Sequence, residues 1–158
     1  EGHNVAFTSL WDNYPDSLEI PLKGKASRAY LLMAGSTNHM QCHIDNGVIR
    51  VYYKDGTCDV MFLRNPDNWP PIEHIFFEDG LAFNRHTPAL YRLRLKTGEI
   101  SNNFGEELGF PGASRELDGG AAVLLEMPLN PGKKLSHLVL ETLSNDVVIG
   151  LMSITLQR

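Results

Sequence analysis

Residues 39–63 read HMQCHIDNGVIRVYYKDGTCDVMFL, and this stretch decides the fold class. Two dipeptides within it, Asn46-Gly47 and Asp55-Gly56, accept the positive φ angles that a two-residue type I′ hairpin turn requires. The residues that flank each dipeptide are largely β-branched or aromatic, as is typical of strands. The stretch therefore predicts three antiparallel strands joined by two tight turns, which is a β-meander.

The alternation of side chains in this meander predicts which of them are buried. If both turns close as two-residue loops, Cys42, Val51 and Val60 lie side by side, because pairing counts outward symmetrically from each turn. The face expected in the core carries Met40, Cys42, Ile44, Ile49, Val51, Tyr53, Cys58, Val60 and Phe62. The opposite face, mostly solvated, carries Gln41, His43, Arg50, Tyr52 and Asp59, with Val48, Met61 and Leu63 as apolar exceptions.

The chain has two cysteines, Cys42 and Cys58, and the meander places both on the expected core face. They would lie two strands and about one pleat repeat apart, so their Cα separation should exceed the ~7 Å that a disulfide allows. We therefore predict two buried free thiols.

Length and composition indicate one globular domain that spans residues 1–158. A chain of 158 residues with 42% hydrophobic residues can bury a full core without disulfides or metals. The net charge of -5, with Lys and Arg spread along the chain, argues against a nucleic-acid partner. No segment approaches the ~20 apolar residues of a membrane span, and no apolar run at the start resembles a signal peptide. Because the chain begins abruptly at Glu1, we expect it to be a piece of a larger protein.

Further strands are expected throughout the chain. The runs that predict them are residues 5–10, 18–22, 29–34, 89–95, 121–129, 135–143 and 147–156. Pro21 confines its strand to an edge or a bulge, because proline cannot donate to the ladder. In residues 89–95, ALYRLRL, the odd positions are apolar, so we expect the arginines to face water.

Three segments between these strands are less regular. Residues 64–71, RNPDNWPP, predict an exposed, stiff loop that carries Trp69. Residues 72–83 fit either a strand with a turn at Asp79-Gly80 or a short helical turn. Residues 101–120, rich in Gly, Asn and charge, form either a functional loop or an ornament on the rim. About nine or ten short strands with frequent turns predict an all-β, antiparallel β-sandwich.

Five segments carry a resemblance to a known family. They are IPLKGKASRAYLLMAGSTN, NGVIRVYYKDGT, NPDNWPPIE, GGAAVLLEMPLNP and NDVVIGLMSITL. Together they resemble the C-terminal β-sandwich of an uncharacterised family of large Bacteroidetes proteins encoded in polysaccharide-utilisation loci. The shorter pattern PLKGKA, AYLLMAG and YYKDGT also resembles the galactose-binding-like jelly rolls attached to glycoside hydrolases. The resemblance implies a jelly-roll accessory domain of a glycan-degrading protein, located in the periplasm or at the cell surface.

The sequence lacks the spacing motifs of common enzymes. It has no GxSxG, HExxH, P-loop or CxxC pattern, so we expect no catalytic activity of its own. Glycoside hydrolysis needs two carboxylates about 5–9.5 Å apart, and acids that are neighbours in loops are usually only solvated. The local acid pairs are Asp12 with Asp16, Glu78 with Asp79, and Glu106 with Glu107.

We assign no metal or cofactor from the sequence. On a strand, His39 and His43 would lie about 13 Å apart and cannot share one ion. They are expected to decorate the solvated face. The jelly-roll resemblance brings a structural calcium into consideration, with Asp12, Asp16 and Asp118 as conceivable ligands, although no spaced loop motif supports it.

Binding of carbohydrate has better support from the residues. Sugars present apolar C–H faces that stack on aromatic rings and hydroxyls that pair with planar polar groups. The loops WDNYPD and NPDNWPP each place an aromatic side chain among such groups, and FNRHTP lies nearby in sequence. The ligand-binding residues predicted in this way are Trp11, Asp12, Asn13, Tyr14, Asn68, Trp69, Arg85 and His86.

Two alternatives remain open at this stage. Trp11 and Tyr14 can instead plug the end of the sandwich, and Trp69 can pack over an edge strand between its prolines, since large aromatics are mostly buried. The domain can also dock on the parent catalytic domain, because interfaces are enriched in Trp, Tyr and Arg. A flat exposed aromatic beside polar groups favours sugar, whereas a broad apolar patch favours docking.

Overall fold

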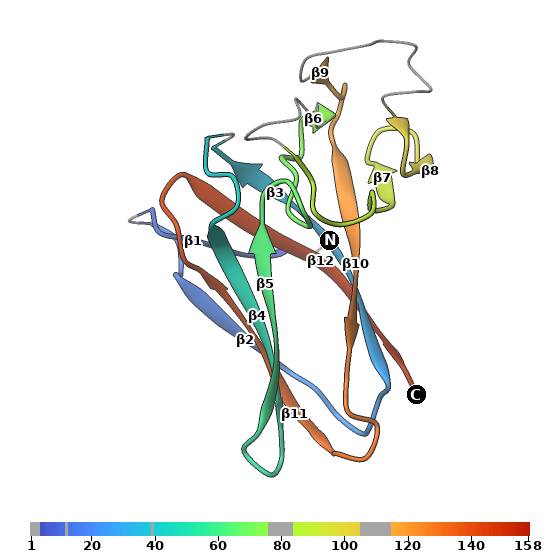
Figure 1. Ribbon diagram of the computed structural model, residues 1–158. Coiled ribbons are helices and arrows are strands. Elements are labelled where there is room, and N and C mark those ends of the chain that lie inside the picture. Colours follow the sequence, from blue (N-terminus) through green and yellow to red (C-terminus); the bar gives the residue numbers. More distant parts are fainter. Residues whose placement is uncertain (1–3, 12, 39, 76–83, 105–114) are drawn as a thin grey trace.

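The computed structural model describes residues 4–11, 13–38, 40–75, 84–104 and 115–158, and its two main antiparallel sheets confirm the all-β sandwich (Figure 1). The larger sheet has the order β1-β12-β3-β10-β7-β8. Its strands are β1 Ala6–Ser9, β12 Val147–Gln157, β3 Arg28–Thr37, β10 Ala121–Pro128, β7 Arg92–Arg94 and β8 Ile100–Ser101.

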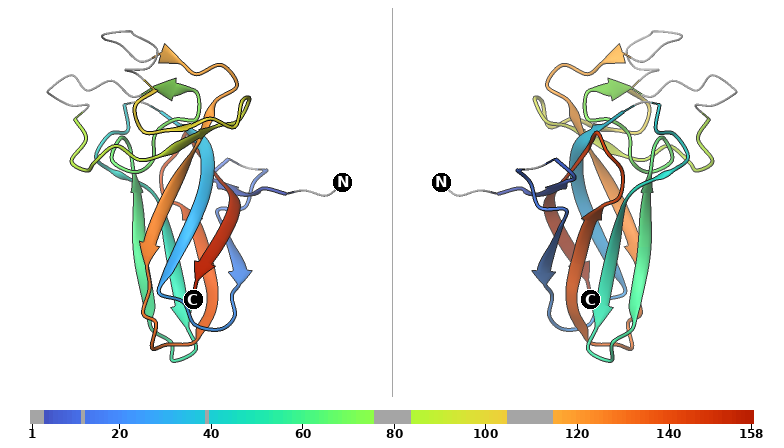
Figure 2. Two further views of the ribbon diagram at one scale, coloured as in Figure 1. Left: turned by 90° about the vertical axis from the view of Figure 1, so that its right-hand side faces the viewer. Right: turned by 90° about the vertical axis from the view of Figure 1, so that its left-hand side faces the viewer.

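The smaller sheet has the order β2-β11-β4-β5. Its strands are β2 Ser17–Pro21, β11 Leu135–Thr142, β4 Asp45–Tyr53 and β5 Cys58–Arg64. Pro21 lies on an edge strand, as predicted, opposite His137 of β11. A short pair, β6 His74–Ile75 with β9 Arg115–Glu116, lies near β7 and β8 at one end of the sandwich (Figure 2).

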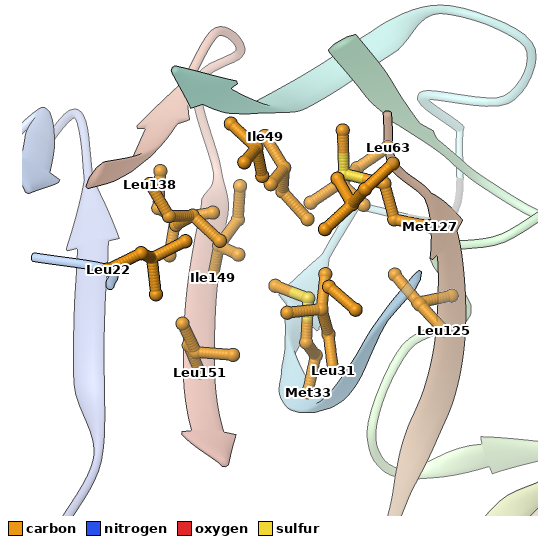
Figure 3. Close-up of a cluster of buried hydrophobic side chains, with 14 of the residues drawn as sticks. Leu22, Leu31, Met33, Ile49, Leu63, Leu125, Met127, Leu138, Ile149 and Leu151 are labelled. Carbon is orange, nitrogen blue, oxygen red and sulfur yellow. The ribbon is translucent and has the colours of Figure 1, made fainter. Parts of the chain in front are cut away.

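The core lies between the two sheets, and alternating side chains from the central strands fill it (Figure 3). Leu31 and Met33 of β3 and Leu125 of β10 face Ile49 of β4 and Leu138 of β11 across the interior. Each fully buried side chain of this size contributes roughly 1.5–3 kcal/mol. The continuous apolar run 29–34 is therefore a central strand of the larger sheet, as the sequence predicts. Among the described residues, no helix is long and apolar enough to cross a membrane.

The first turn predicted in the meander does not form, because Asn46 and Gly47 lie inside β4 and are buried. The Asn46 amide accepts a hydrogen bond from the Thr37 hydroxyl at 2.7 Å and donates to the carbonyls of Gln41 and Ile44. A Cβ on Gly47 would lie 2.2 Å from Cδ1 of Ile149 and 3.0 Å from the Glu141 carbonyl oxygen, so close packing favours glycine here. Met40 and Ile44, expected in the core, are exposed.

The second turn forms at Asp55-Gly56, but with a loop of three residues. The Tyr53 N–H donates to the Thr57 carbonyl at 2.9 Å, and the N–H of Gly56, whose φ is 84°, donates to Tyr53. Val51 therefore pairs with Asp59, not with Val60. A slip of one residue turns every side chain of a strand to the other face.

The observed register reverses the predicted inward and outward faces of β5. Val60 and Phe62, expected in the core, are exposed, and Leu63 is buried in their place. The two cysteines form no disulfide with each other, as predicted, but the prediction that they are buried is wrong. Cys58 is exposed on β5. Cys42 is half-buried, and its backbone pairs with that of Asn65 in a parallel β-bridge outside the named strands.

Tyr53 joins the β4–β5 turn to the loop that connects β10 with β11 at the far end of the sandwich. Its buried hydroxyl donates to Asp59 and accepts a hydrogen bond from the Asn130 N–H at 2.7 Å. Burial, together with the bond to Asp59, raises the pKa of Tyr53 to about 12. In the adjacent turn, hydrogen bonds from Thr57 and Lys133 hold the pKa of Asp55 below its usual range. The turn and the loop therefore form one connected unit.

The expectation that the arginines of residues 89–95 face water fails at Arg92. Its guanidinium donates to the carbonyls of Pro71, Ile72 and Ala121 at 2.9–3.2 Å, and also to His74. Burial lowers the pKa of Arg92 to about 10, and the charge of Glu73 opposes this effect. Tyr91 and Leu95 are exposed instead. The guanidinium supplies hydrogen-bond donors to carbonyls of the loop that precedes β6.

Trp69 is fully buried, which contradicts the predicted exposed loop. The loop turns directly after β5, where the N–H groups of Asn68 and Trp69 both donate to the Arg64 carbonyl. The Trp69 ring enters the core against Gly35 of β3, where an added Cβ would lie 2.7 Å from Cζ2 of the ring. Residues 72–83 were expected to form either a strand with a turn or a short helical turn. Most of this segment, residues 76–83, lies outside the described residues.

Gly35→Ala should lower the free energy of unfolding by about 1–3 kcal/mol or more, because overpacking forces the core apart. The new Cβ would lie 1.9 Å from the Val148 carbonyl oxygen and 2.7 Å from the Trp69 ring. Urea unfolding followed by circular dichroism measures the change. Gly132→Ala is the control, since its nearest neighbour is the Asn130 side chain at 3.2 Å. Equal stability of the two variants would contradict the packing described here.

The Cys58 thiol should react with iodoacetamide in the folded protein, and it should react faster than the Cys42 thiol. The reason is that the three-residue turn places Cys58 on the solvent face of β5. Brief alkylation followed by peptide mass spectrometry measures both sites in one sample. If Cys58 reacts only after the protein unfolds, the three-residue turn is contradicted. The turn would then have two residues, and Cys58 would face the core.

Candidate functional site

Strand β1 and the loop that follows it carry an exposed group of three aromatic side chains, here named the aromatic cluster: Phe7, Trp11 and Tyr14. Their exposed fractions are 39%, 51% and 40%. Tyr14 lies between the other two, because its ring centroid is 5.2 Å from that of Phe7 and 6.2 Å from that of Trp11. The Phe7 contact is edge-to-face and the Trp11 contact is tilted, and both are favourable arrangements of rings.

Backbone hydrogen bonds hold this loop in shape. The Tyr14 N–H donates to the Trp11 carbonyl at 2.9 Å, which closes a turn, and the Ser9 N–H donates to the Pro15 carbonyl at 3.0 Å. Below the loop, the buried hydroxyl of Ser9 donates to the Val147 carbonyl at 2.8 Å. The aromatic cluster is therefore fixed to the body of the sandwich.

Polar residues occur in the same loop as Trp11 and Tyr14. Asn13 and Asp16 are exposed there, and the Asp16 carbonyl accepts a hydrogen bond from the Thr142 N–H at 2.9 Å. Asp12, also predicted to bind ligand, lies outside the described residues. Trp11, Asn13 and Tyr14 are thus all exposed in one loop, which also carries Asp16.

The second predicted loop contributes differently. Trp69 belongs to the core and offers no ring face to a ligand. The Asn68 amide accepts a hydrogen bond from the Arg64 N–H at 2.7 Å and donates to the Phe62 carbonyl at 2.8 Å, so it holds the turn together. Arg85 is half-buried, and His86 is exposed beside Asp67.

Each predicted acid pair includes a residue outside the described part of the chain, as does the set of conceivable calcium ligands. Glu78, Asp79, Glu106 and Glu107 lie outside the described residues, as Asp12 does. Asp118 is exposed and paired with Lys96, whose hydrogen bond lowers the pKa of the Asp118 carboxyl. Asp16 lies in the β1–β2 loop. Among the described residues, neither Asp16 nor Asp118 belongs to a group of three or more side chains that could hold a metal ion.

Two features of this surface were not predicted from the sequence. Phe7 is exposed on β1 while Thr8 and Ser9 are buried, an inversion of the usual polarity that no local pattern reveals. A shallow hollow of about 440 Å³ lies beside the start of β1. It is lined mainly by Val5, Ile20, Leu151, Met152 and Ile154.

No protein-family model, no curated protein and no solved structure matches this chain. The resemblance to a C-terminal domain of polysaccharide-utilisation proteins therefore stays a prediction from the quoted segments. The function has to be argued from the surface itself.

Asn68→Ala should lower the free energy of unfolding by about 0.5–1.5 kcal/mol, because the Arg64 N–H and the Phe62 carbonyl exchange their partner for water. Chemical unfolding of the two proteins measures the difference. Asn102→Ala is the matched control, since Asn102 is exposed on a loop. A loss no larger than that of the control would mean that the Asn68 amide does not hold the turn.

Proposed function

We propose that this chain is a carbohydrate-binding accessory domain, and that the aromatic cluster is the surface that contacts sugar. The observation that carries the proposal is the half-exposed Trp11 ring, which contacts Tyr14 in a loop where Asn13 and Asp16 are also exposed. An exposed ring beside amide and carboxylate groups matches the two recognition needs of a sugar, which are C–H stacking and hydroxyl pairing.

The shape of the loop adds to this support. Binding costs less free energy when the binding surface is ordered beforehand. The turn at Trp11–Tyr14 is closed by a hydrogen bond of 2.9 Å, and the loop is closed by a second bond of 3.0 Å. A shallow surface of this kind suits contact with an extended polysaccharide better than catalysis in a deep cleft.

The parent protein and its location are part of the proposal. The quoted segments resemble galactose-binding-like jelly rolls attached to glycoside hydrolases, and the β-sandwich architecture agrees with that class. On this basis we place the domain in a glycan-degrading protein of the periplasm or cell surface. The domain itself is proposed to be non-catalytic, with catalysis left to the parent.

Docking on the parent catalytic domain is the second candidate, and a specific observation favours it. The apolar hollow beside β1 lies next to Val5, which is itself partly exposed, as is Phe7. A contiguous apolar surface is typical of a contact between domains. The two candidates thus place different demands on neighbouring residues: docking uses Val5 and the hollow, whereas sugar binding uses Trp11.

Trp11→Ala should weaken glycan binding by about tenfold or more, which is ~1.4 kcal/mol, because it removes the stacking face. A glycan array identifies the sugar, and calorimetric titration of the wild type and the variant measures the affinity. Tyr91→Ala is the control, since Tyr91 is an exposed aromatic residue at 55% outside the cluster. Absence of binding to any glycan at millimolar concentration, or equal losses in both variants, would contradict the proposal.

A further inference from the structure

Three potential metal ligands from segments far apart in the sequence meet beside the buried Trp69. His43 precedes β4, Asp67 follows β5, and His86 belongs to the segment before β7. Asp67 Oδ2 lies 3.9 Å from His43 Nδ1 and 3.6 Å from His86 Nδ1. The three ligand atoms all lie within 4.8 Å of one another. This group, the His–Asp–His cluster, shares no residue with the aromatic cluster.

The backbone holds each member of the cluster in place. The His43 N–H donates to the Asn65 carbonyl at 2.8 Å, and His43 has a φ of 57°, so it is part of a turn and not of a strand. The His86 N–H donates to Asp67 Oδ1 at 2.7 Å, and the Thr87 hydroxyl donates to the Asp67 carbonyl at 2.8 Å. Both histidines are thus attached to the short segment that carries Asp67.

The spacing fits an ion better than direct hydrogen bonds. Nitrogen–oxygen distances of 3.6 and 3.9 Å exceed the 2.7–3.2 Å of a normal hydrogen bond. Tetrahedral coordination at about 2.0–2.2 Å places neighbouring ligand atoms about 3.3–3.6 Å apart. The two imidazole rings lie close to each other, with their centroids 4.5 Å apart, and the His86 side chain is exposed.

We propose that His43, Asp67 and His86 form a binding site for a divalent transition-metal ion, with Zn²⁺ as the best fit. Two imidazole nitrogens and one carboxylate oxygen suit zinc and its neighbours, whereas calcium requires a shell of oxygen ligands. The His86 N–H fixes Asp67 Oδ1, which leaves Oδ2 directed at both imidazoles. Outer-shell hydrogen bonds of this kind orient metal ligands.

The site has three protein ligands and faces solvent. Asp67 is largely buried, with 15% of its side chain exposed, while His86 is 68% exposed. Three ligands leave the fourth tetrahedral position to water or to a donor from another molecule. The inference is independent of the proposed function, because it stands on other residues and on a different chemistry.

Calorimetric titration of the whole chain, first freed of metal with a chelator, with Zn²⁺ alone tests the site. The wild type should bind one ion with an affinity in the micromolar range or tighter. His86→Ala and His43→Ala should each weaken binding at least ~10-fold, since loss of even an outer-shell partner costs about 10–100-fold. Asp67→Asn tests the carboxylate, because its amide oxygen can still accept the His86 N–H.

His137→Ala is the matched control, since His137 lies on β11 stacked on Tyr52 and away from the cluster. It should bind Zn²⁺ like the wild type. Co²⁺ absorption spectra give a second measurement that reports tetrahedral coordination directly. Circular dichroism of each metal-free variant verifies folding, and the exposure of His86 makes His86→Ala the safest variant.

Two results would overturn the proposal. One is a wild-type dissociation constant for Zn²⁺ in the millimolar range or weaker. The three side chains would then form only two histidine–carboxylate contacts and no metal site. The other is micromolar binding that survives in folded His86→Ala and His43→Ala, which would place the ion elsewhere.

Discussion

The packing of Trp69 against Gly35 is the contact on which the loop-bearing end of this sandwich depends. Burial of an indole ring contributes roughly 4–6 kcal/mol at 150–250 Å² of apolar area. Among the described residues the indole N–H has no hydrogen-bond partner, so packing alone holds the ring. Glycine at position 35 of β3 provides the space that the ring occupies. The chain after β5 must therefore turn inward at once, which places Asp67 at the surface between His43 and His86.

The same anchoring separates two surfaces with different chemistry. The aromatic cluster lies on β1 and the loop after it, and Ser9 of β1 donates to the Val147 carbonyl of β12. The His–Asp–His cluster sits on the turn that Trp69 anchors. Each surface is built from groups whose backbone is hydrogen-bonded, so each is positioned before any ligand arrives. Neither surface requires the other to form.

Much of the fold was predictable from the sequence because its signals are local. The apolar run 29–34 and the final three strands follow from periodicity and turn residues, and Pro21 correctly predicts an edge strand. The register of the central hairpin was not predictable, because Asp55-Gly56 is compatible with both a two-residue and a three-residue turn. That difference of one residue decides whether Cys58 or Leu63 is buried. The dipeptide Asn46-Gly47 predicted a turn for a different reason. Its glycine packs closely against Ile149, and this tertiary contact cannot be told from a turn signal in the sequence.

The candidate sites were predictable only in part. Trp11 and Tyr14 are exposed, in agreement with the loop composition, but Trp69 occurs in a similar polar, proline-rich loop and is buried. The notch at Gly35 that accepts Trp69 is a feature of a distant strand, so no local pattern reveals it. His43, Asp67 and His86 likewise meet only through long-range contacts of three separate loops. Local composition therefore predicts which residue types are available, and tertiary structure decides which of them share a surface.

The two tryptophans give the most direct test, since the account assigns one to the surface and one to the core. In Trp11→Phe, the fluorescence of the folded protein comes from Trp69 alone, and iodide should quench it far less than in urea. The wild type should show an additional, readily quenched fraction from Trp11. Equal quenching of Trp69 by iodide in the folded and unfolded variant would contradict the account, because the turn that carries Asp67 would then have no anchor in the core.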